Sequence, residues 1–242
     1  MSDIHGCYQP MLSVLGYANY VPGVDTLVVG GDMIDRGPDS AYVIREIRWL
    51  QQNHPNVHVL SGNHEDMFKN FYNGKDDMWL AHGVEAIDSF QQAFTEEEFG
   101  ELAEWLTTLP STFEDERHLF VHAGINPNRR VQLREEMLWM PYDSHDQKRF
   151  SSYSVKDILH WTDGRKVVHG HTPKHRVIDD GARICCDLGA GVLPGGKLAL
   201  VDLTNDEVYF YDFVTDKVGS YMLERKQGQK GRRRINEGPV YH

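Results

Sequence analysis

Short apolar runs rich in Val, Ile and Leu recur along the first three quarters of the chain, and each ends abruptly in Gly or a small polar residue. Such runs are typical of strands that are buried on both faces of a sheet. Helical patterns lie between them, so strands and helices alternate and the sequence predicts a layered α/β fold. The expected strands are residues 26–29, 57–60, 119–121 and 166–168, and the expected helices are 40–52, 65–72 and 95–106.

The pattern changes after about residue 176 to short strands separated by turns, which predicts antiparallel sheet at 197–202, 208–213 and 218–223. We therefore expect one domain over residues 1–224. Residues 225–242 carry little apolar content and an Arg232–Arg234 run, which is typical of a basic, mobile tail.

A side chain that can bind a metal ion follows each of the first four strands. Because the carboxyl ends of strands in an open α/β sheet meet at one edge, we expect these side chains to converge on one site. Two further donors lie at the start of the chain. The candidates are Asp32, Asn63 with His64, His122 and His171, together with Asp3 and His5.

The candidate donors are oxygen and imidazole groups without a thiolate, which suits Mn, Fe, Zn or Ni. Six donors are too many for one tetrahedral site, and a carboxylate such as Asp32 can bridge two cations. Two cations about 3.5 to 4 Å apart are the usual device for in-line attack at phosphorus. The sequence therefore predicts hydrolysis of phosphate esters.

Composition limits the partners of the protein. With 25 Lys and Arg against 36 Asp and Glu, the net charge is -11, which argues against a surface for nucleic acid. No apolar run approaches the roughly 20 residues of a membrane span. The three cysteines are Cys7, Cys185 and Cys186, an odd number that fits a reducing compartment, so we expect a cytoplasmic chain.

Five sequence blocks resemble, in order and spacing, the calcineurin-like metallophosphoesterases. The resemblance runs from residue 2 to about 202 and implies a sandwich of two mixed β-sheets flanked by α-helices. The GDxxDRG and GNHE forms resemble the phosphoprotein phosphatase branch, especially its bacterial and bacteriophage lambda-type enzymes. The blocks are SDIHG at 2–6, GDMIDRG at 31–37, GNHE at 62–65, VHAG at 121–124 and GHTP at 170–173.

The resemblance also implies a role for each residue of the site, with two divalent cations bound, Mn first and Fe, Zn, Ni or Mg as alternatives. Hydroxide supplied by the cations would attack phosphorus directly, without a covalent phosphoenzyme, and a proton donor would assist the leaving alkoxide. Asp3, His5 and bridging Asp32 would hold one metal; Asp32, Asn63, His122 and His171 would hold the other; His64, oriented by Asp35, would be the general acid; and Arg36 and Asn63 would bind the phosphate.

The chain departs from the family pattern at three places. The family has a strand before its first Asp, whereas only two residues precede Asp3 here, and we expect that the natural chain begins upstream. Lambda-type relatives have a second phosphate-binding Arg where this chain has Pro141, and Arg149 or Lys148 from the following loop is the candidate to replace it. Pro173 stands where many distant relatives have a second His, as is usual in the phosphoprotein phosphatase branch.

The resemblance leaves the substrate open. A Ser/Thr phosphoprotein is the first expectation, with phosphotyrosine or another phosphorylated small molecule beside it. Diadenosine tetraphosphate or a related nucleotide is the alternative, because bacterial members with nearly identical metal blocks hydrolyse it. A binding module with a weakened site is a third hypothesis. Trp79 and the aromatic residues after it are expected to pack helices rather than to cover the site.

Overall fold

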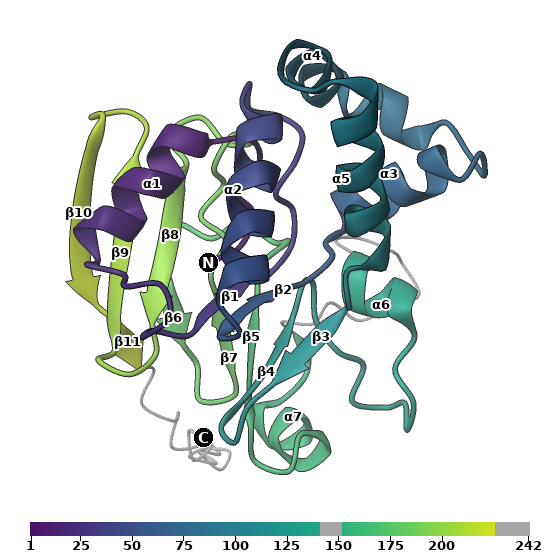
Figure 1. The fold of residues 1–242 in the computed structure, drawn as a ribbon. Coiled ribbons are helices and arrows are strands. Elements are labelled where there is room, and N and C mark those ends of the chain that lie inside the picture. The colour runs from purple at the N-terminus through teal and green to yellow at the C-terminus, as the bar shows by residue number, and fades with distance from the viewer. Residues whose placement is uncertain (141–151, 226–242) are drawn as a thin grey trace, which may run out of the picture.

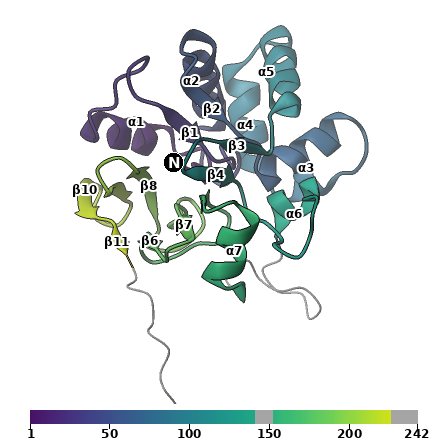
Figure 2. The same cartoon turned by 90° about the horizontal axis from the view of Figure 1, so that it is seen from below.

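The computed structural model describes residues 1–140 and 152–225, and its strands form the centre of a layered molecule (Figure 1). Helices lie on the outer sides of these strands (Figure 2). The strands are β1 (Leu27–Val29), β2 (Val57–Val59), β3 (Thr112–Glu114), β4 (His118–Val121), β5 (Lys166–His169), β6 (Ile178–Asp179), β7 (Arg183–Cys185), β8 (Lys197–Asp202), β9 (Glu207–Asp212), β10 (Lys217–Met222) and β11 (Glu224–Arg225).

The described strands form three hydrogen-bonded sets. The largest is mixed and has the order β11-β6-β7-β5-β4-β3, in which β4, β5 and β7 run parallel. β8, β9 and β10 form an antiparallel set, and β1 and β2 form a parallel pair of their own. The predicted α/β sandwich of mixed sheets flanked by helices is thus confirmed.

The helices form where the apolar spacing fits one buried face. In α2, Ala41, Ile44 and Ile47 recur at intervals of three and are fully buried. A capping box begins α5, because the Thr95 hydroxyl accepts the N–H of Glu98 and the Glu98 carboxylate accepts the N–H of Thr95. The helices are α1 (Tyr8–Tyr17), α2 (Ser40–Asn53), α3 (Asn63–Tyr72), α4 (Val84–Ala93), α5 (Glu96–Thr108), α6 (Arg134–Trp139) and α7 (Val155–Trp161), with the 3₁₀ helix η1 (Met78–Ala81) between α3 and α4.

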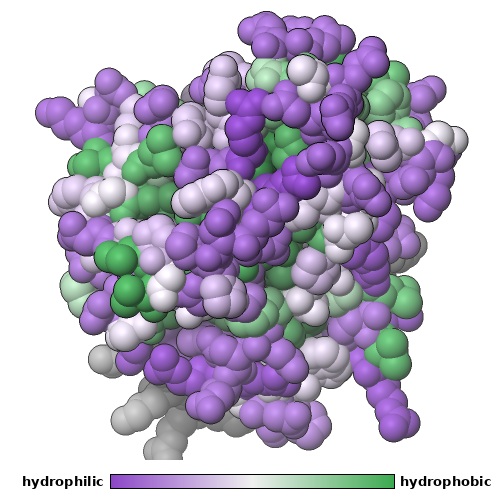
Figure 3. Space-filling model, viewed as in Figure 1, coloured by the Kyte–Doolittle hydropathy of each residue, from purple (hydrophilic) through white to green (hydrophobic). Residues whose placement is uncertain are grey.

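Three groups of buried side chains join the layers. One lies among β1, β2 and the helices α1 to α5. A second joins the six-stranded sheet to β8 and β9 through residues such as Phe120, Ile184, Ala199 and Val208. The third packs α7 through Ile158 onto β4 and β5. The face seen in Figure 3 is mainly hydrophilic, with hydrophobic side chains in separate groups.

The helices of the described residues include none that is long and apolar enough to span a membrane. Arg225, the first residue of the predicted tail, belongs to β11 and forms an ion pair with Asp206. The rest of that tail, residues 226–242, lies outside the described residues, as does the segment 141–151 that contains Arg149.

The first three residues pair with β1 and its continuation in a parallel sense. The Met1 ammonium donates to the carbonyl of Val28 at 2.9 Å, the Gly30 N–H donates to the carbonyl of Met1 at 2.9 Å, and the Asp3 N–H donates to the carbonyl of Gly31 at 3.0 Å. These bonds carry Asp3 to the end of β1, where the site lies.

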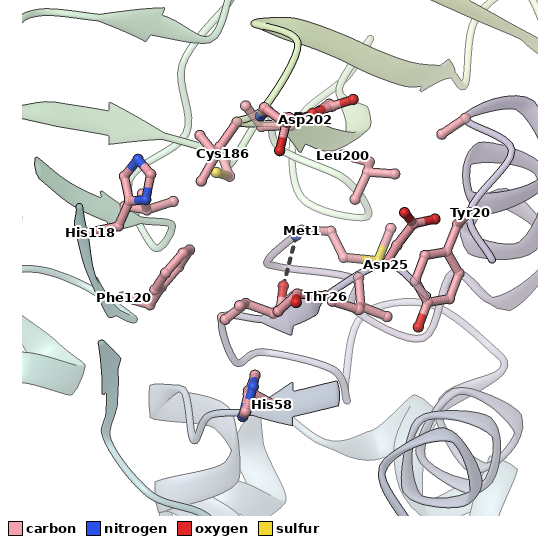
Figure 4. A pocket seen from close by; sticks show the side chains of 18 of the residues that line it. Met1, Tyr20, Asp25, Thr26, His58, His118, Phe120, Cys186, Leu200 and Asp202 are labelled. Carbon is pink, nitrogen blue, oxygen red and sulfur yellow. Dashed lines mark hydrogen bonds between the residues drawn. The ribbon is translucent and has the colours of Figure 1, made fainter. Parts of the chain in front are cut away.

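A cavity of about 730 Å³ opens beside this segment, between β1, β4 and β8. Figure 4 shows the Met1 ammonium and its bond to β1, with Phe120 and Leu200 among the surrounding side chains. Met1 is only 7% exposed, and burial lowers the pKa of its ammonium. The edge of β1 that faces away from β2 therefore borders an open space.

Candidate metal centre

The predicted donors meet at the carboxyl ends of four strands. Asp32 follows β1, Asn63 begins α3 directly after β2, His122 follows β4 and His171 follows β5. The pairs β1–β2 and β4–β5 are each parallel, so their carboxyl ends point the same way. The structure therefore brings together residues that are more than a hundred positions apart in the sequence.

Asn63 lies at the middle of the first group of donors. Its Oδ1 is 2.9 Å from Nε2 of His122 and 2.9 Å from Nδ1 of His171. Oδ2 of Asp32 is 3.4 Å from Nε2 of His122. Potential ligand atoms of Asp32, His122 and His171 all lie within 4.8 Å of one another. This spacing suits one cation held by carboxylate, amide and imidazole groups.

Asp32 also belongs to a second group, because its Oδ2 is 3.7 Å from Nε2 of His5. Ligand atoms of His5, Asp32 and His64 lie within 4.8 Å of one another. Asp3, the other predicted ligand, is buried beside them, and its two carboxylate oxygens accept the backbone N–H of His171 at 3.0 and 3.2 Å. Asp32 is therefore the carboxylate shared by both groups.

Backbone carbonyls fix the orientation of two imidazoles. Nδ1 of His5 is 3.0 Å from the carbonyl of Ile34, and Nδ1 of His122 is 2.9 Å from the carbonyl of Gly30. A carbonyl accepts only, so each Nδ1 carries a proton and, in the neutral ring, each Nε2 presents a lone pair to the site. Nε2 of His122 then faces Oδ1 of Asn63, also an acceptor, so a cation between them satisfies both.

Buried charge points to the same conclusion. Burial opposes protonation of His122, but Asp32 outweighs it and raises the pKa of His122 to about 10, so a cation that binds Nε2 must displace its proton. Burial lowers the pKa of His5 to about 4 and that of His171 to about 3, so both rings are neutral at pH 7, as ligation requires. Burial and the nearby Asp187 carboxylate raise the pKa of Asp3 well above its usual value. Neutral imidazoles and buried carboxylates together are the ligands that a divalent cation requires, so the donors fit a bound metal.

Left-handed backbone conformations are concentrated in the site. Of the ten non-glycine residues with positive φ among those described, six are site residues, with φ between 46° and 71°. Such conformations cost about 1 to 3 kcal/mol each and persist only where the surroundings impose them. They are Asp3, His5, Asp32, Asp35, Arg36 and His171. The loops are therefore shaped for the donors they carry.

Glu65 has a part in the site that the sequence analysis missed. It is fully buried, and its carboxylate accepts the N–H groups of Asp32, Met33 and Gly62, each at 2.8 Å. These three bonds tie the loop that carries Asp32 to the start of α3. The signal in the sequence was the fourth residue of GNHE, which stands at the third position of a helix, where a Glu can accept backbone N–H groups.

His64 and Asp35 form a close pair beside the donors. Nδ1 of His64 is 2.6 Å from Oδ2 of Asp35, and the His64 backbone N–H donates to Oδ1 of Asp32 at 3.0 Å. Burial lowers the pKa of the imidazole, but Asp32 and Asp35 outweigh it, so the pKa of His64 is raised. The pair can therefore hold a proton near neutral pH.

Arg36 is exposed, and its guanidinium has no hydrogen bond or ion pair with the residues that the structure describes. Its charge contributes to lowering the pKa of His5, which places it next to the donors. An exposed guanidinium at the rim of a cationic centre is available to an anionic ligand. His169, two residues before His171, is buried in β5 with Nδ1 3.0 Å from the carbonyl of Gly170.

Comparisons with known proteins agree with this geometry. The family model described as calcineurin-like phosphoesterase matches residues 1–184. The symmetrical bis(5'-nucleosyl)-tetraphosphatase of Chromobacterium violaceum is 30% identical over 172 residues, which cover 69% of this chain and 59% of that protein. The enzyme of the same name from Escherichia coli strain K12 is 30% identical over 142 residues, or 56% of this chain and 46% of that protein. The chain thus aligns with about half the length of these relatives.

A solved structure of a cold-active protein-tyrosine phosphatase from a psychrophilic Shewanella superimposes with a TM-score of 0.64. It is 18% identical, and the match covers 91% of this chain and 78% of that chain. At this identity the likeness shows the shared fold.

Proposed function

The chain belongs to the calcineurin-like phosphoesterase family, and from this we propose that it is a metal-dependent hydrolase whose substrate is a dinucleoside tetraphosphate. The observation that carries the proposal of a metal-dependent hydrolase is the meeting of Asp32, Asn63, His122 and His171 at the ends of four strands. The substrate rests on the named relatives, which are 30% identical to this chain over about half of their own length.

We propose that Asp32, Asn63, His122 and His171 hold one divalent cation and that Asp3, His5 and Asp32 hold the second. Bound there, such cations polarise phosphate oxygens and lower the pKa of water. We propose Mn as the first choice of metal. Fe, Zn and Ni are alternatives because they bind imidazole well, and Mg is an alternative because it binds oxygen ligands.

The remaining side chains act on the substrate. Arg36, whose guanidinium has no partner among the residues that the structure describes, binds phosphate oxygens, for which its planar fork is suited. His64 presents Nε2 because its Nδ1 is held by Asp35 at 2.6 Å. A proton on Nε2 can be donated to the oxygen that leaves phosphorus.

When a phosphoanhydride bond of a dinucleotide is cleaved, the leaving group is an oxygen of the departing nucleotide's terminal phosphate. This oxygen is a stable anion near neutral pH, because the second pKa of such a phosphate is about 6. The substrate therefore needs cation and guanidinium contacts more than it needs a proton. The net charge of the whole chain is negative, so these contacts depend on the cations and on Arg36 rather than on a general basic surface.

A Ser/Thr phosphoprotein is the second candidate, and the His64–Asp35 pair favours it. The alkoxide that leaves phosphoserine is a strong base, so a proton donor contributes roughly 100- to 10,000-fold to its departure. A buried imidazole whose pKa is raised beside a carboxylate is suited to that task. A dinucleotide would use this pair less.

Product analysis and rate comparison test the proposal together. Protein supplied with Mn is assayed on diadenosine tetraphosphate and on a phosphoserine peptide at equal concentration. We expect two ADP as the only products of the dinucleotide and kcat/KM about 100-fold above that for the peptide. A preference for the peptide would move the assignment to the second candidate.

Elemental analysis separates both enzyme assignments from the binding module. Protein purified without chelator should hold close to two metal equivalents if the centre forms as proposed. Turnover of neither substrate together with well under one equivalent would mean that the site is not an enzyme centre.

A further inference from the structure

The carboxylate of Asp35 has two donors, of which His64 is only one. The indole Nε1 of Trp79 donates to Oδ1 at 3.0 Å and lies 3.2 Å from Oδ2, while Oδ2 also receives Nδ1 of His64 at 2.6 Å. Asp35 is 0% exposed, so water does not compete for these oxygens. Two donors from different directions fix the rotation of a carboxylate, whereas one donor leaves it free to turn.

The plane of the Asp35 carboxylate sets the direction of the His64 ring. With Nδ1 held, the ring turns Nε2 toward the centre, and the ring lies edge-on to His5 with 4.8 Å between centroids. A proton donor must lie within hydrogen-bond reach of the leaving oxygen, and a displacement of about 1 Å can cost 100-fold in rate. Whatever holds Asp35 therefore affects proton transfer.

The position of Trp79 is itself fixed. The side chain is 2% exposed, and its ring contacts Phe68, Phe71 and Phe90 at centroid distances of 4.9, 5.3 and 6.3 Å. A Cβ placed on Gly83 would lie 2.5 Å from Cε2 and 2.6 Å from Nε1 of the indole. The absence of a side chain at residue 83 is what leaves room for the ring to point Nε1 at Asp35.

We propose that Trp79 is a positioning residue for proton donation, which holds the Asp35 carboxylate so that Asp35 holds His64. This inference rests on the metal-dependent hydrolase of the proposed function and not on its choice of substrate, because it concerns the group that can protonate a basic leaving oxygen. Trp79 lies on η1, outside all five sequence blocks of the family resemblance, and its indole N–H donates to Asp35.

Leaving-group selectivity tests the proposal. Trp79→Phe removes the N–H and keeps a ring among the phenylalanines. On a phosphoserine peptide we expect kcat to fall about 10-fold, in line with the loss of one hydrogen bond to a charged group, with KM changed less than about twofold. On p-nitrophenyl phosphate, whose leaving group needs little protonation, kcat should change less than about twofold.

Two further variants distinguish positioning from packing. Phe90→Leu opens the same aromatic cluster without touching Asp35, so any loss it causes should be equal on the two esters. Gly83→Ala keeps the indole but displaces it, and it should reproduce the selective loss of Trp79→Phe. In a His64→Asn background, Trp79→Phe should have no further effect on the peptide, because residues that act as a unit are not additive.

Equal losses on both esters in Trp79→Phe, or a further loss in the His64→Asn background, would overturn the inference and leave the proposed function intact. Failure of the unsubstituted protein to hydrolyse either ester or the dinucleotide would overturn the proposed function, and this inference with it.

Discussion

Glu65→Gln replaces a carboxylate that accepts three backbone N–H groups by an amide with one oxygen. Oε2 accepts from Asp32 and Gly62 and Oε1 accepts from Met33, each at 2.8 Å. The Gln side chain keeps two of the three bonds if its amide oxygen takes the place of Oε2. Its NH2 group then takes the place of Oε1 and faces the Met33 N–H, which loses its acceptor. The loss of that charge-assisted bond costs about 1.5 to 3 kcal/mol, and the stranded N–H costs about 1 to 3 kcal/mol more.

The substitution also removes a buried negative charge, which offsets part of this loss because burial and Asp32 raise the pKa of Glu65. We therefore expect the free energy of unfolding to fall by about 2 to 4 kcal/mol. The measurement is urea unfolding at equilibrium, with stability taken from the midpoint and slope.

Glu98→Gln is the matched control, because Glu98 has the same place in the capping box of α5. Glu98 is exposed, its hydrogen bonds are to Thr95, and its 4.0 Å ion pair with Arg45 is exposed as well, so the loss there should be clearly smaller than at Glu65. Equal losses at the two positions would show that Glu65 is an ordinary cap and would refute the argument that it joins two loops of the site.

Three shorter predictions concern other parts of the molecule. Asp32→Asn should lower the content of both metals at once by elemental analysis, since this carboxylate is shared; loss of one equivalent alone would contradict the sharing. Two apolar residues added ahead of Met1 should enter the cavity beside β1 and raise the unfolding free energy by about 2 kcal/mol for each buried side chain, relative to a Gly-Ser addition of equal length. Burial lowers the pKa of His169 to about 4, so this group alone should contribute a loss of about 3 kcal/mol in the metal-free protein as pH falls from 6.5 to 4, and His169→Gln should remove that part of the slope in urea titrations.

The sequence predicted the strands that carry the donors because burial on both faces selects unbroken runs of Val, Ile and Leu. The expected strand at 57–60 is observed as Val57–Val59, and 197–202 is observed as Lys197–Asp202. Convergence of Asp32, Asn63, His122 and His171 was predicted for the same reason, since parallel strands present their carboxyl ends to one side. Element ends differed by one or two residues, because capping and fraying decide them.

The supporting contacts of the site could not be predicted in the same way. Glu65 and Trp79 act through backbone N–H groups and a carboxylate that lie 32 to 44 positions away in the sequence. No periodicity encodes such contacts, because they arise only when loops meet. The expectation that Trp79 packs helices was correct as far as its ring is concerned and missed the indole N–H.

Backbone strain and buried like charges at the centre mean that bound metals would stabilise the fold as well as take part in the reaction. Six residues hold positive φ there, and Asp3, Asp32 and Asp187 are buried together, so the loops are unfavourable on their own account. Cations that bind only the folded chain stabilise it in proportion to the logarithm of their concentration over Kd. The residues that make the centre costly are the ones a cation would contact, so a substitution that relieves this cost in the metal-free protein also weakens metal binding. A change that relaxes one loop, such as Asp32→Gly, should therefore lose metal even where it costs the metal-free protein little.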